Sequence, residues 1–336
     1  MTPILVAGGA GYIGSHTAKL LRQFGFLPVA LDNLITGNRW AVRFGPFVEG
    51  SVGDRLLVER TIKENGIQGA ILFAAHAYVG ESTAQPAKYY RNNIAESIAF
   101  LDALLATNVR ALVFSSSCSI YGIQEVIPIG EDSPKRPLSP YAETKLFLEN
   151  ALRWYEQAYG LRSICLRYFN AAGADPEGEI GECHDPETHL IPLAIDAALG
   201  GPPLRILGTD YPTPDGTAIR DYIHVTDLAD AHVRALRALF QNPTPSLCGA
   251  SFNCGTGIGH SVKQVVETVE RISGCSVPVE YAPRRQGDAA ALVADASLIG
   301  QGLGWVPRFS SIDTVVGTAW RWAAEGKSRY LTLLSQ

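Results

Sequence analysis

Near its N-terminus the chain has an apolar run, a set of spaced glycines and a helical segment in direct succession. Residues 4–7 read as a buried strand, Gly8, Gly11 and Gly14 follow it, and residues 15–24 read as a helix. Glycines at these positions permit a tight turn, a close approach of the backbone to a pyrophosphate, and close packing of the helix. The phosphates would lie at the positive end of that helix. The segment therefore predicts the first unit of a dinucleotide-binding sheet.

A carboxylate follows the next predicted strand. Residues 27–31 are apolar and end in Asp32. At this distance from the glycines, an acidic residue binds the adenosine ribose hydroxyls. Because Asp32 would repel a 2′-phosphate, we predict NAD rather than NADP as the cofactor.

Strand and helix signals keep alternating through the first half of the chain. Further strands are predicted at 68–75, 111–115 and 162–169, and a long amphipathic helix at 86–107. Such alternation predicts an α/β fold, a Rossmann-type doubly wound parallel sheet with helices on both faces. Ligands in these folds bind at the carboxyl ends of the strands. We expect three segments at that edge, beside the glycine loop: Ala74–His76, Ser115–Ser117 and Tyr168–Asn170.

The second half of the chain differs in composition. From Asp175 onward it is richer in proline and glycine and its elements are shorter. We predict an NAD-binding Rossmann domain over 1–172 and a smaller α/β substrate-binding domain over 173–336. Residues around 222–240 are predicted to form a helix able to pack back on the first domain.

Tyr141 and Lys145 stand four residues apart in the segment that begins at Ser139. Residues at this spacing share one face of a helix, so the phenol and the ammonium can reach the same pocket. Lowering a phenol pKa by about three units requires roughly 4 kcal/mol, which one cation at ~4 Å supplies at an effective dielectric of ~20. We expect Lys145 to lower the pKa of Tyr141 and make it a general base. The pattern also occurs on ordinary helices, so its meaning depends on its neighbours.

Composition excludes several classes of protein. The 336 residues carry a net charge of −5 and no basic block, which argues against a nucleic-acid partner. No apolar stretch approaches the ~20 residues that cross a membrane. The six cysteines are scattered and form no CxxC pair, which favours free thiols in a reducing cytoplasm. Cys183 and His184 are adjacent rather than ligand-spaced, so we expect no metal site.

A series of motifs runs from Gly8 to about Trp305: GGAGYIGSH (8–16), DNL..GN (32–38), FAAHAYVGES (73–82), YYRNN (89–93), SSSCSIYG (115–122), SPYAETK (139–145), RYFNAAGA (167–174), ETHLIP (187–192), DYPTPDGT.IRDYIHV.DLA.AH (210–232) and APRR.GD (282–288). Together they resemble the extended short-chain dehydrogenase/reductases, and among these the UDP-glucose (UDP-galactose) 4-epimerase family. The first motifs identify only the superfamily. The block from 210 to 232 is more specific to the epimerases.

The resemblance assigns roles to individual residues. Tyr141 would be the acid/base, Lys145 its modulator and the anchor of the nicotinamide ribose, and Ser117 the partner of the sugar 4-hydroxyl. The residues expected to bind NAD are Gly8, Gly11, Tyr12, Ile13, Gly14, Asp32, Asn33, Ser51, Val52, Phe73, Ala74, Ala75, Asn92, Ser115, Tyr141, Lys145 and Tyr168. Those expected to bind the UDP-sugar are Ser117, Tyr141, Phe169, Asn170, His189, Leu190, Leu207, Arg220, Arg285 and Asp288. The two arginines would hold the diphosphate, because a guanidinium donates a planar pair of hydrogen bonds.

The reaction implied is NAD-dependent 4-epimerisation of a UDP-sugar, with UDP-glucose and UDP-galactose as the first expectation. Tyr141 would remove the 4-hydroxyl proton while the hydride at C4 passes to NAD. The resulting 4-keto sugar would turn in the pocket and take the hydride back on its other face. The resemblance also implies a homodimer formed through the helices at 86–107 and 141–159.

Departures from the family pattern leave alternatives open. Ser51 replaces an aspartate that contacts adenine, Ala77 a lysine near the cofactor pyrophosphate, and Leu207 a phenylalanine near the uracil. Leu292 stands where some relatives have a tyrosine that restricts sugar size, so UDP-N-acetylglucosamine or UDP-xylose/UDP-arabinose epimerisation stays open. A nucleotide-sugar 4,6-dehydratase would need an Asp-Glu pair at the positions of Cys118 and Ser119. A non-catalytic NAD-binding sensor would typically lack the Tyr/Lys pair.

Overall fold

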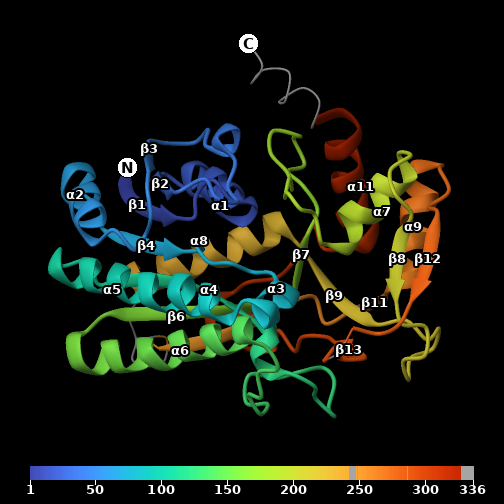
Figure 1. Cartoon of the computed structure of the whole chain (residues 1–336). Coiled ribbons are helices and arrows are strands. Elements are labelled where there is room, and N and C mark those ends of the chain that lie inside the picture. The colour runs from blue at the N-terminus through green and yellow to red at the C-terminus, as the bar shows by residue number, and fades with distance from the viewer. Residues whose placement is uncertain (242–246, 248, 286, 327–336) are drawn as a thin grey trace.

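A seven-stranded parallel sheet organises the larger part of the molecule (Figure 1). The computed structural model describes residues 1–241, 247, 249–285 and 287–326. The strand order is β10-β6-β5-β4-β1-β2-β3, and each neighbouring pair is parallel. The strands are β1 (Thr2–Ala7), β2 (Phe26–Asp32), β3 (Phe47–Glu49), β4 (Gly69–Leu72), β5 (Ala111–Ser117), β6 (Arg162–Tyr168) and β10 (Ala250–Cys254). This topology confirms the predicted Rossmann-type fold class.

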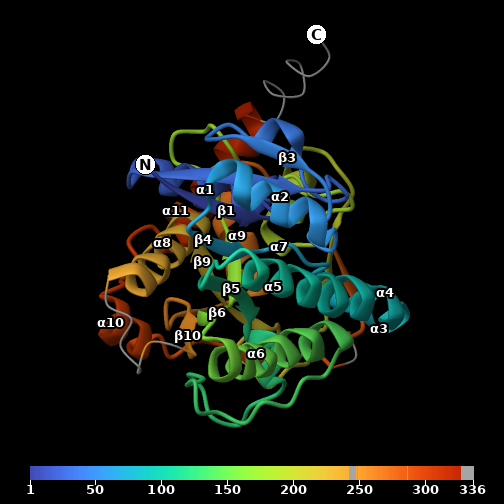
Figure 2. The same cartoon turned by 90° about the vertical axis from the view of Figure 1, so that its left-hand side faces the viewer.

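Helices cover both faces of the sheet because its strands are apolar on both sides. In β1, Leu5 and Ala7 pack into one core while Ile4 and Val6 pack into the other. Alternate residues of a strand point to opposite faces, so a continuous apolar run serves two cores. One core lies under α2 (Arg55–Asn65), α5 (Ser97–Ala106) and α6 (Pro140–Tyr159), and the other under α1 (Tyr12–Gln23), α8 (Val225–Gln241) and α10 (Ser297–Leu303). Figure 2 shows the two groups of helices on either side of the sheet.

Helix α6 has clear start and stop signals. The Ser139 side chain caps it by accepting a hydrogen bond from the Ala142 amide at 3.2 Å, and Pro140 occupies the first turn. Gly160 ends it in the left-handed conformation. These signals fix where the helix begins and ends, so Tyr141 lies in its first turn and Lys145 one turn later on the same face.

The helical run predicted at 86–107 is present but is not uniform. It consists of α4 (Pro86–Tyr89), a π-helix (Tyr90–Glu96) and α5. A π-helix widens the turn locally, and such segments often lie at functional sites. Here the wider turn carries Asn92 and Asn93.

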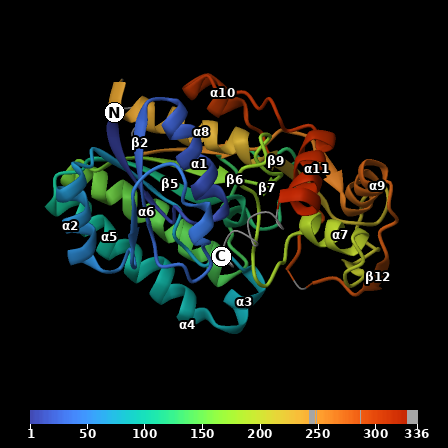
Figure 3. The same ribbon diagram turned by 90° about the horizontal axis from the view of Figure 1, so that it is seen from above.

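The smaller part of the molecule is built around β9 (Ile219–His224), which lies beyond the carboxyl edge of the large sheet (Figures 1 and 3). Strand β9 pairs with β7 (Asn170–Ala172), β11 (Gly259–Ser261) and β13 (Ala291–Leu292), and β8 (Leu204–Leu207) pairs with β12 (Val279–Ala282). Helices α7 (Leu190–Ala198), α9 (Val262–Ser273) and α11 (Ile312–Arg321) enclose a third core with these strands.

Two segments from the second half of the chain belong with the large sheet. Helix α8 packs on α1, and β10 forms an edge of the sheet beside β6. The division at residue 172 stays a prediction.

The helices and the cysteines bear on the expectations drawn from composition. None of the helices in the described ranges is long and apolar enough to cross a membrane. Cys118, Cys165, Cys254 and Cys275 are free thiols, as predicted, and Cys248 lies outside the described residues.

Candidate active site

The glycine loop between β1 and α1 forms a concave backbone surface, a cradle, and side chains at its glycine positions would clash with the surrounding backbone. Gly8 has φ +85°, and a Cβ there would lie 2.7 Å from the backbone nitrogen of Ala74. A Cβ on Gly14 would overlap the carbonyl oxygen of Gly8. Gly11 begins α1 without a side-chain cap. The first amides of an α-helix have no intrahelical acceptor, so those of Tyr12 and Ile13 suit a phosphate.

Asp32 ends β2 beside this loop and is buried. Its two carboxylate oxygens accept hydrogen bonds from the amides of Ala10 at 3.0 Å and Leu34 at 2.9 Å. Burial raises the pKa of Asp32, while the two amides oppose that shift. Each carboxylate oxygen keeps a further lone pair for a ribose hydroxyl. The cradle and this carboxylate together fit the NAD predicted from the sequence.

The carboxylate of Glu96 lies beside Ser51, one of the residues predicted to lie near adenine. Ser51 donates its hydroxyl proton to Glu96 at 2.6 Å and accepts from the amide of Gly53 at 2.9 Å, and Val52 beside it is buried. Sequence reasoning did not identify Glu96, which lies 45 residues from Ser51 in the chain. The pair places a carboxylate where Ser51 replaces the family's aspartate.

The π-helix fixes the loop that follows β4. The amide of His76 donates to Asn92 Oδ1 at 3.1 Å and Asn93 Oδ1 at 2.9 Å. Asn93 also donates to the carbonyl of His76 at 3.0 Å. These bonds hold the segment from Phe73 to Ala75 at the carboxyl edge of the sheet, next to Gly8.

Ser117, Tyr141 and Lys145 meet at the end of β5. A hydrogen bond joins Tyr141 to Ser117, and the Lys145 Nζ donates to the carbonyl of Ser115 at 2.7 Å. The Nζ lies 5.8 Å from the centre of the Tyr141 ring. The Ser115 hydroxyl accepts a short hydrogen bond from Tyr168, which brings β6 to the same place.

The pKa values of this pair differ from the expectation that Lys145 lowers the pKa of Tyr141. Burial raises the pKa of Tyr141 to about 12, and the hydrogen bond from Ser117 only partly offsets it. Burial lowers the pKa of Lys145 to about 7, while Glu149 opposes that shift. Burial removes water from both groups and penalises the phenolate and the ammonium alike. This effect outweighs the stabilisation that one ammonium gives to one phenolate.

A buried ionic network lies directly behind this site. Glu149 on α6 accepts from Arg167 Nε at 2.9 Å, from Arg167 Nη2 at 2.7 Å and from Ser116 Oγ at 2.5 Å. Arg167 also donates to the Tyr121 hydroxyl at 2.9 Å. The network ties α6, β5 and β6 together at the residues next to Ser117 and Tyr168. Sequence reasoning missed it, because partners 18 residues apart on a helix and a strand give no local pattern.

The predicted substrate residues divide into three groups. Phe169 packs with Cys118, and Leu292 packs against this cluster. Cys118 is buried and its pKa is raised to about 12 by burial, which agrees with the packed thiol expected there. Leu292 pairs with Arg220 across β13 and β9, and Asn170 begins β7, which pairs with the later part of β9.

The second group is a set of cations around Tyr211. Arg285 pairs with Asp288 at 3.1 Å, and Arg284 stacks 4.3 Å from the Tyr211 ring centre. The charges of Arg220, Arg284 and Arg285 all act to lower the Tyr211 pKa, although its burial, the largest effect, raises it. Within the described ranges, the buried Tyr211 hydroxyl has no hydrogen-bond partner. Three guanidiniums and one free hydroxyl suit a diphosphate and its nucleoside. Sequence reasoning missed Tyr211 and Arg284, although both stand inside quoted motifs.

Other predicted substrate residues lie on the smaller part. Leu207 is partly exposed at the end of β8, and Leu190 begins α7 against the third core. His189 precedes α7 and forms ion pairs with Glu182 at 2.9 Å and Glu187 at 2.8 Å. These carboxylates raise the pKa of His189 to about 10, against the effect of burial.

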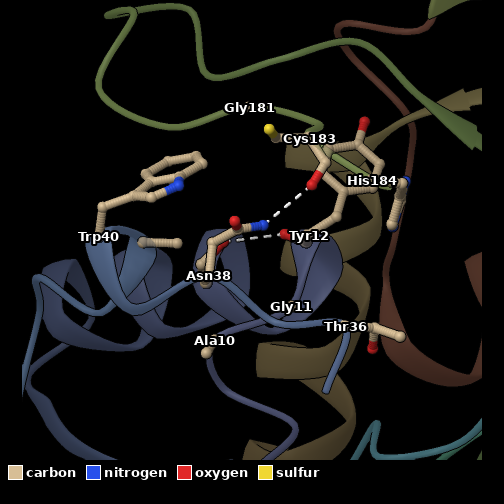
Figure 4. Close-up of a pocket in the computed structure, with 11 residues that line it drawn as sticks. Ala10, Gly11, Tyr12, Thr36, Asn38, Trp40, Gly181, Cys183 and His184 are labelled. Carbon is tan, nitrogen blue, oxygen red and sulfur yellow. Dashed lines mark hydrogen bonds between the residues drawn. The ribbon is translucent and has the colours of Figure 1, made fainter. Parts of the chain in front are cut away.

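The loop that carries Glu182 also borders the start of α1. Asn38 Nδ2 donates to the carbonyl of Cys183 at 2.9 Å, and the Tyr12 ring lies edge-on to the ring of His184 (Figure 4). Tyr12 donates to the carbonyl of Gly173 at 2.6 Å. The loop therefore closes over the predicted pyrophosphate position.

Comparisons with known proteins agree with this geometry. Residues 4–255 match the NAD dependent epimerase/dehydratase family. A UDP-glucose 4-epimerase of Halalkalibacterium halodurans is 46% identical over 330 residues, which cover 98% of each chain. The structure of a UDP-glucose 4-epimerase from Brucella ovis in complex with NAD is 50% identical with a TM-score of 0.91, covering 95% of this chain and 98% of that one. A UDP-glucose-4-epimerase from Stenotrophomonas maltophila, with bound NAD and formylated UDP-arabinopyranose, is 37% identical with a TM-score of 0.91, covering 99% and 100%. The chain belongs to the NAD dependent epimerase/dehydratase family.

Proposed function

We propose that this protein is an NAD-dependent 4-epimerase of UDP-sugars, with UDP-glucose and UDP-galactose as its substrates. The observation that carries the proposal is the meeting of Ser117, Tyr141 and Lys145 beside the glycine loop. Relatives that cover nearly the whole chain are named UDP-glucose 4-epimerase. The reaction predicted from the sequence and the family shown by the comparisons therefore agree.

In this proposal the amide cradle at Gly8 to Gly14 and the Asp32 carboxylate hold NAD. The cofactor supplies a hydride acceptor and donor for C4 of the sugar. Tyr141 takes the proton of the 4-hydroxyl and later returns it, with Ser117 as the second hydrogen-bond partner. Lys145, whose pKa of about 7 lies near the working pH, can hold or release a proton beside the phenol. The two groups then titrate as a coupled pair.

The uridine diphosphate needs a firm grip while the sugar stays free to turn. Arg220 and Arg285, together with Arg284 and Tyr211, provide that grip on the smaller part of the molecule. The sugar then lies between this group and Tyr141, beside the Phe169 and Leu292 side chains. The binding energy comes from contacts with the part of the substrate that does not react. These contacts position C4 and leave either face of the ketone able to meet the cofactor.

A second group of substrates follows from Leu292. This side chain packs against the cluster that contains Phe169 and Cys118, the residue after Ser117, and it is an aliphatic chain where some relatives have a tyrosine. The relative from Stenotrophomonas was solved with a UDP-pentose derivative, and a relative from Campylobacter jejuni is named a UDP-Glc/GlcNAc 4-epimerase. UDP-xylose/UDP-arabinose and UDP-N-acetylglucosamine are therefore the alternative substrates to test.

The test is an NMR assay of the purified protein against UDP-glucose, UDP-N-acetylglucosamine and UDP-xylose. Equilibration of UDP-glucose with UDP-galactose supports the proposal, and the relative rates show which sugars the site accepts. Tyr141→Phe should lower turnover about 10²- to 10⁴-fold while NAD binding is retained. No reaction with any of the three, even with NAD added, would refute the proposed activity, and a near-wild-type rate in Tyr141→Phe would refute the role of Tyr141.

Assembly as a cytoplasmic homodimer is part of the proposal. Tyr89 and Phe100 are buried within the subunit, but Trp154 is 70% exposed on α6, and Phe147 and Tyr159 on the same helix are also exposed. Large exposed aromatic side chains on one helix favour a protein interface. Light scattering after size exclusion at micromolar concentration should give twice the mass of one chain, and a monomer mass would refute the dimer.

A further inference from the structure

The loop Gly181 to His189 is anchored to three separate elements. Its backbone accepts hydrogen bonds from Asn38 Nδ2 at 2.9 Å, from the Tyr78 hydroxyl at 3.0 Å and from Trp322 Nε1 at 2.9 Å. These donors come from the loop after β2, the loop after β4 and the π-helix after α11 (Trp322–Gly326). The loop therefore connects the nucleotide-binding part to the start of α7.

Four side chains of this loop converge on one point. They are Glu182, His184, Glu187 and His189, and one ligand atom from each lies within 4.8 Å of the others. Glu182 Oε1 is 3.1 Å from His184 Nδ1 and 2.9 Å from His189 Nδ1. Glu187 oxygens are 3.7 Å from His184 Nδ1 and 2.8 Å from His189 Nδ1.

The carboxylate at the centre of this cluster is buried. The Glu182 side chain is only 7% exposed. Over the described ranges, its Oε1 pairs with the two ring nitrogens, His184 Nδ1 and His189 Nδ1. A buried carboxylate held between two imidazoles suits a cation site, because a metal ion can replace the proton on each ring.

We propose that Glu182, His184, Glu187 and His189 bind a divalent transition-metal ion, with Zn²⁺ the best fit. Imidazole nitrogens and carboxylate oxygens are zinc ligands at about 2.0 to 2.2 Å. A tetrahedron with those bond lengths has ligand atoms about 3.3 Å apart. The four separations measured here bracket that value. Two carboxylates also neutralise the charge of a dication.

A second acidic cluster differs from this one because a lysine side chain already lies at its centre. Asp175, Glu177 and Glu179 also converge, but the Lys19 Nζ lies 2.7 to 2.9 Å from all three. An ammonium therefore already lies at the centre of that cluster. In the loop cluster the positive charges are those of the two imidazole rings, whose protons a metal ion can displace, and the groups facing one another are ring nitrogens and carboxylate oxygens.

The bound ion would fasten the loop rather than take part in the reaction. Four protein ligands close the coordination sphere, which is typical of structural zinc sites. The ion would hold the start of α7 against the loop next to Tyr12. Only Nδ1 of His189 lies in the cluster, so its Nε2 remains available for the substrate contact predicted from the sequence. The sequence did not predict this site, because the four ligands alternate within one loop without a familiar spacing.

The test measures zinc directly and does not depend on epimerase activity. Full-length protein is stripped with a chelator, dialysed against zinc, and analysed by elemental mass spectrometry and thermal unfolding. We expect about one zinc per chain and a higher Tm. His184→Gln and Glu187→Gln should each weaken zinc binding at least 10-fold. Glu177→Gln, in the cluster that Lys19 occupies, is the control and should bind zinc as wild type does.

X-ray absorption of the zinc-loaded wild type covers the case in which a variant fails to fold. A first shell of nitrogen and oxygen alone supports the proposed ligands, whereas a sulfur neighbour would assign the ion to a cysteine and overturn them. Wild-type protein that keeps less than a tenth of an equivalent of zinc overturns the proposal. Unchanged zinc binding in His184→Gln and Glu187→Gln does so as well.

Discussion

Replacing Glu149 with glutamine should destabilise the protein strongly without touching the substrate pocket. Glu149 is buried on α6 and accepts two hydrogen bonds from Arg167 and one from Ser116. Glutamine has nearly the same shape but is neutral, and its amide NH₂ would face a guanidinium donor. Arg167 is itself buried, so its charge would be left without a counter-charge.

The expected cost follows from that burial. Removing one partner of a buried ion pair costs about 3 to 5 kcal/mol. Glutamine keeps one carbonyl acceptor, and Arg167 keeps its bond to Tyr121, so we expect about 3 kcal/mol, the low end of that range. Total stabilities of about 5 to 15 kcal/mol make this a large fraction. Turnover at a temperature where the variant is folded should fall less than 10-fold, because Ser117, Tyr141 and Lys145 are all retained.

The assay is urea unfolding of the cofactor-free protein at pH 7, followed by circular dichroism. Glu143→Gln provides the matched control, because Glu143 is on the same helix but exposed. The Glu143→Gln substitution should lower the free energy of unfolding by less than about 0.5 kcal/mol. A Glu149→Gln cost below about 1 kcal/mol would show that water or rearrangement compensates Arg167, and would refute the reasoning.

Three further predictions concern the cofactor, the sugar and the response to acid. Gly8→Ala should abolish NAD binding measured by calorimetry, because its Cβ would meet the Ala74 backbone at a positive φ. Leu292→Tyr should lower the rate with UDP-N-acetylglucosamine relative to UDP-glucose by about 10- to 100-fold, and an unchanged ratio would remove Leu292 from the pocket. Burial lowers the pKa of His232 from 6.5 to about 4, so the unfolded state binds more protons between those values, and stability falls as pH falls through that window. From pH 6.5 to 5 this amounts to about 1.6 kcal/mol; a His232→Gln variant should lose that part of the pH dependence, and identical slopes in urea unfolding would contradict it.

Much of the site was predictable because its signals are local. The glycine loop, Asp32, the serine run at the end of β5, and the Tyr141/Lys145 spacing each lie within a few residues of a recognisable strand or helix. The continuous apolar run of β1 predicts that both faces of the sheet are covered. The parallel order then brings the carboxyl ends of β1, β2, β4, β5 and β6 to one edge, because alternating strands and helices have few other ways to pack.

Other parts of the site depend on contacts between distant segments. The partners Ser51 and Glu96 meet across 45 residues, and Arg167 meets Glu149 and Tyr121 from a different element of the sheet. The expectation that Lys145 lowers the pKa of Tyr141 was wrong for the same reason. Sequence spacing places an ammonium near the phenol, but only packing determines how far both are removed from water.

The sequence by itself determined the fold class and the family and predicted the reacting groups, since these depend on short motifs and on hydrophobic periodicity. The tertiary structure decided how the groups are charged, which side chains support them, and that the loop 181–189 gathers the four side chains proposed to bind a metal ion. Desolvation and ion pairing depend on everything that surrounds a group in space. Those surroundings come from residues far apart in the chain, so no local pattern can specify them.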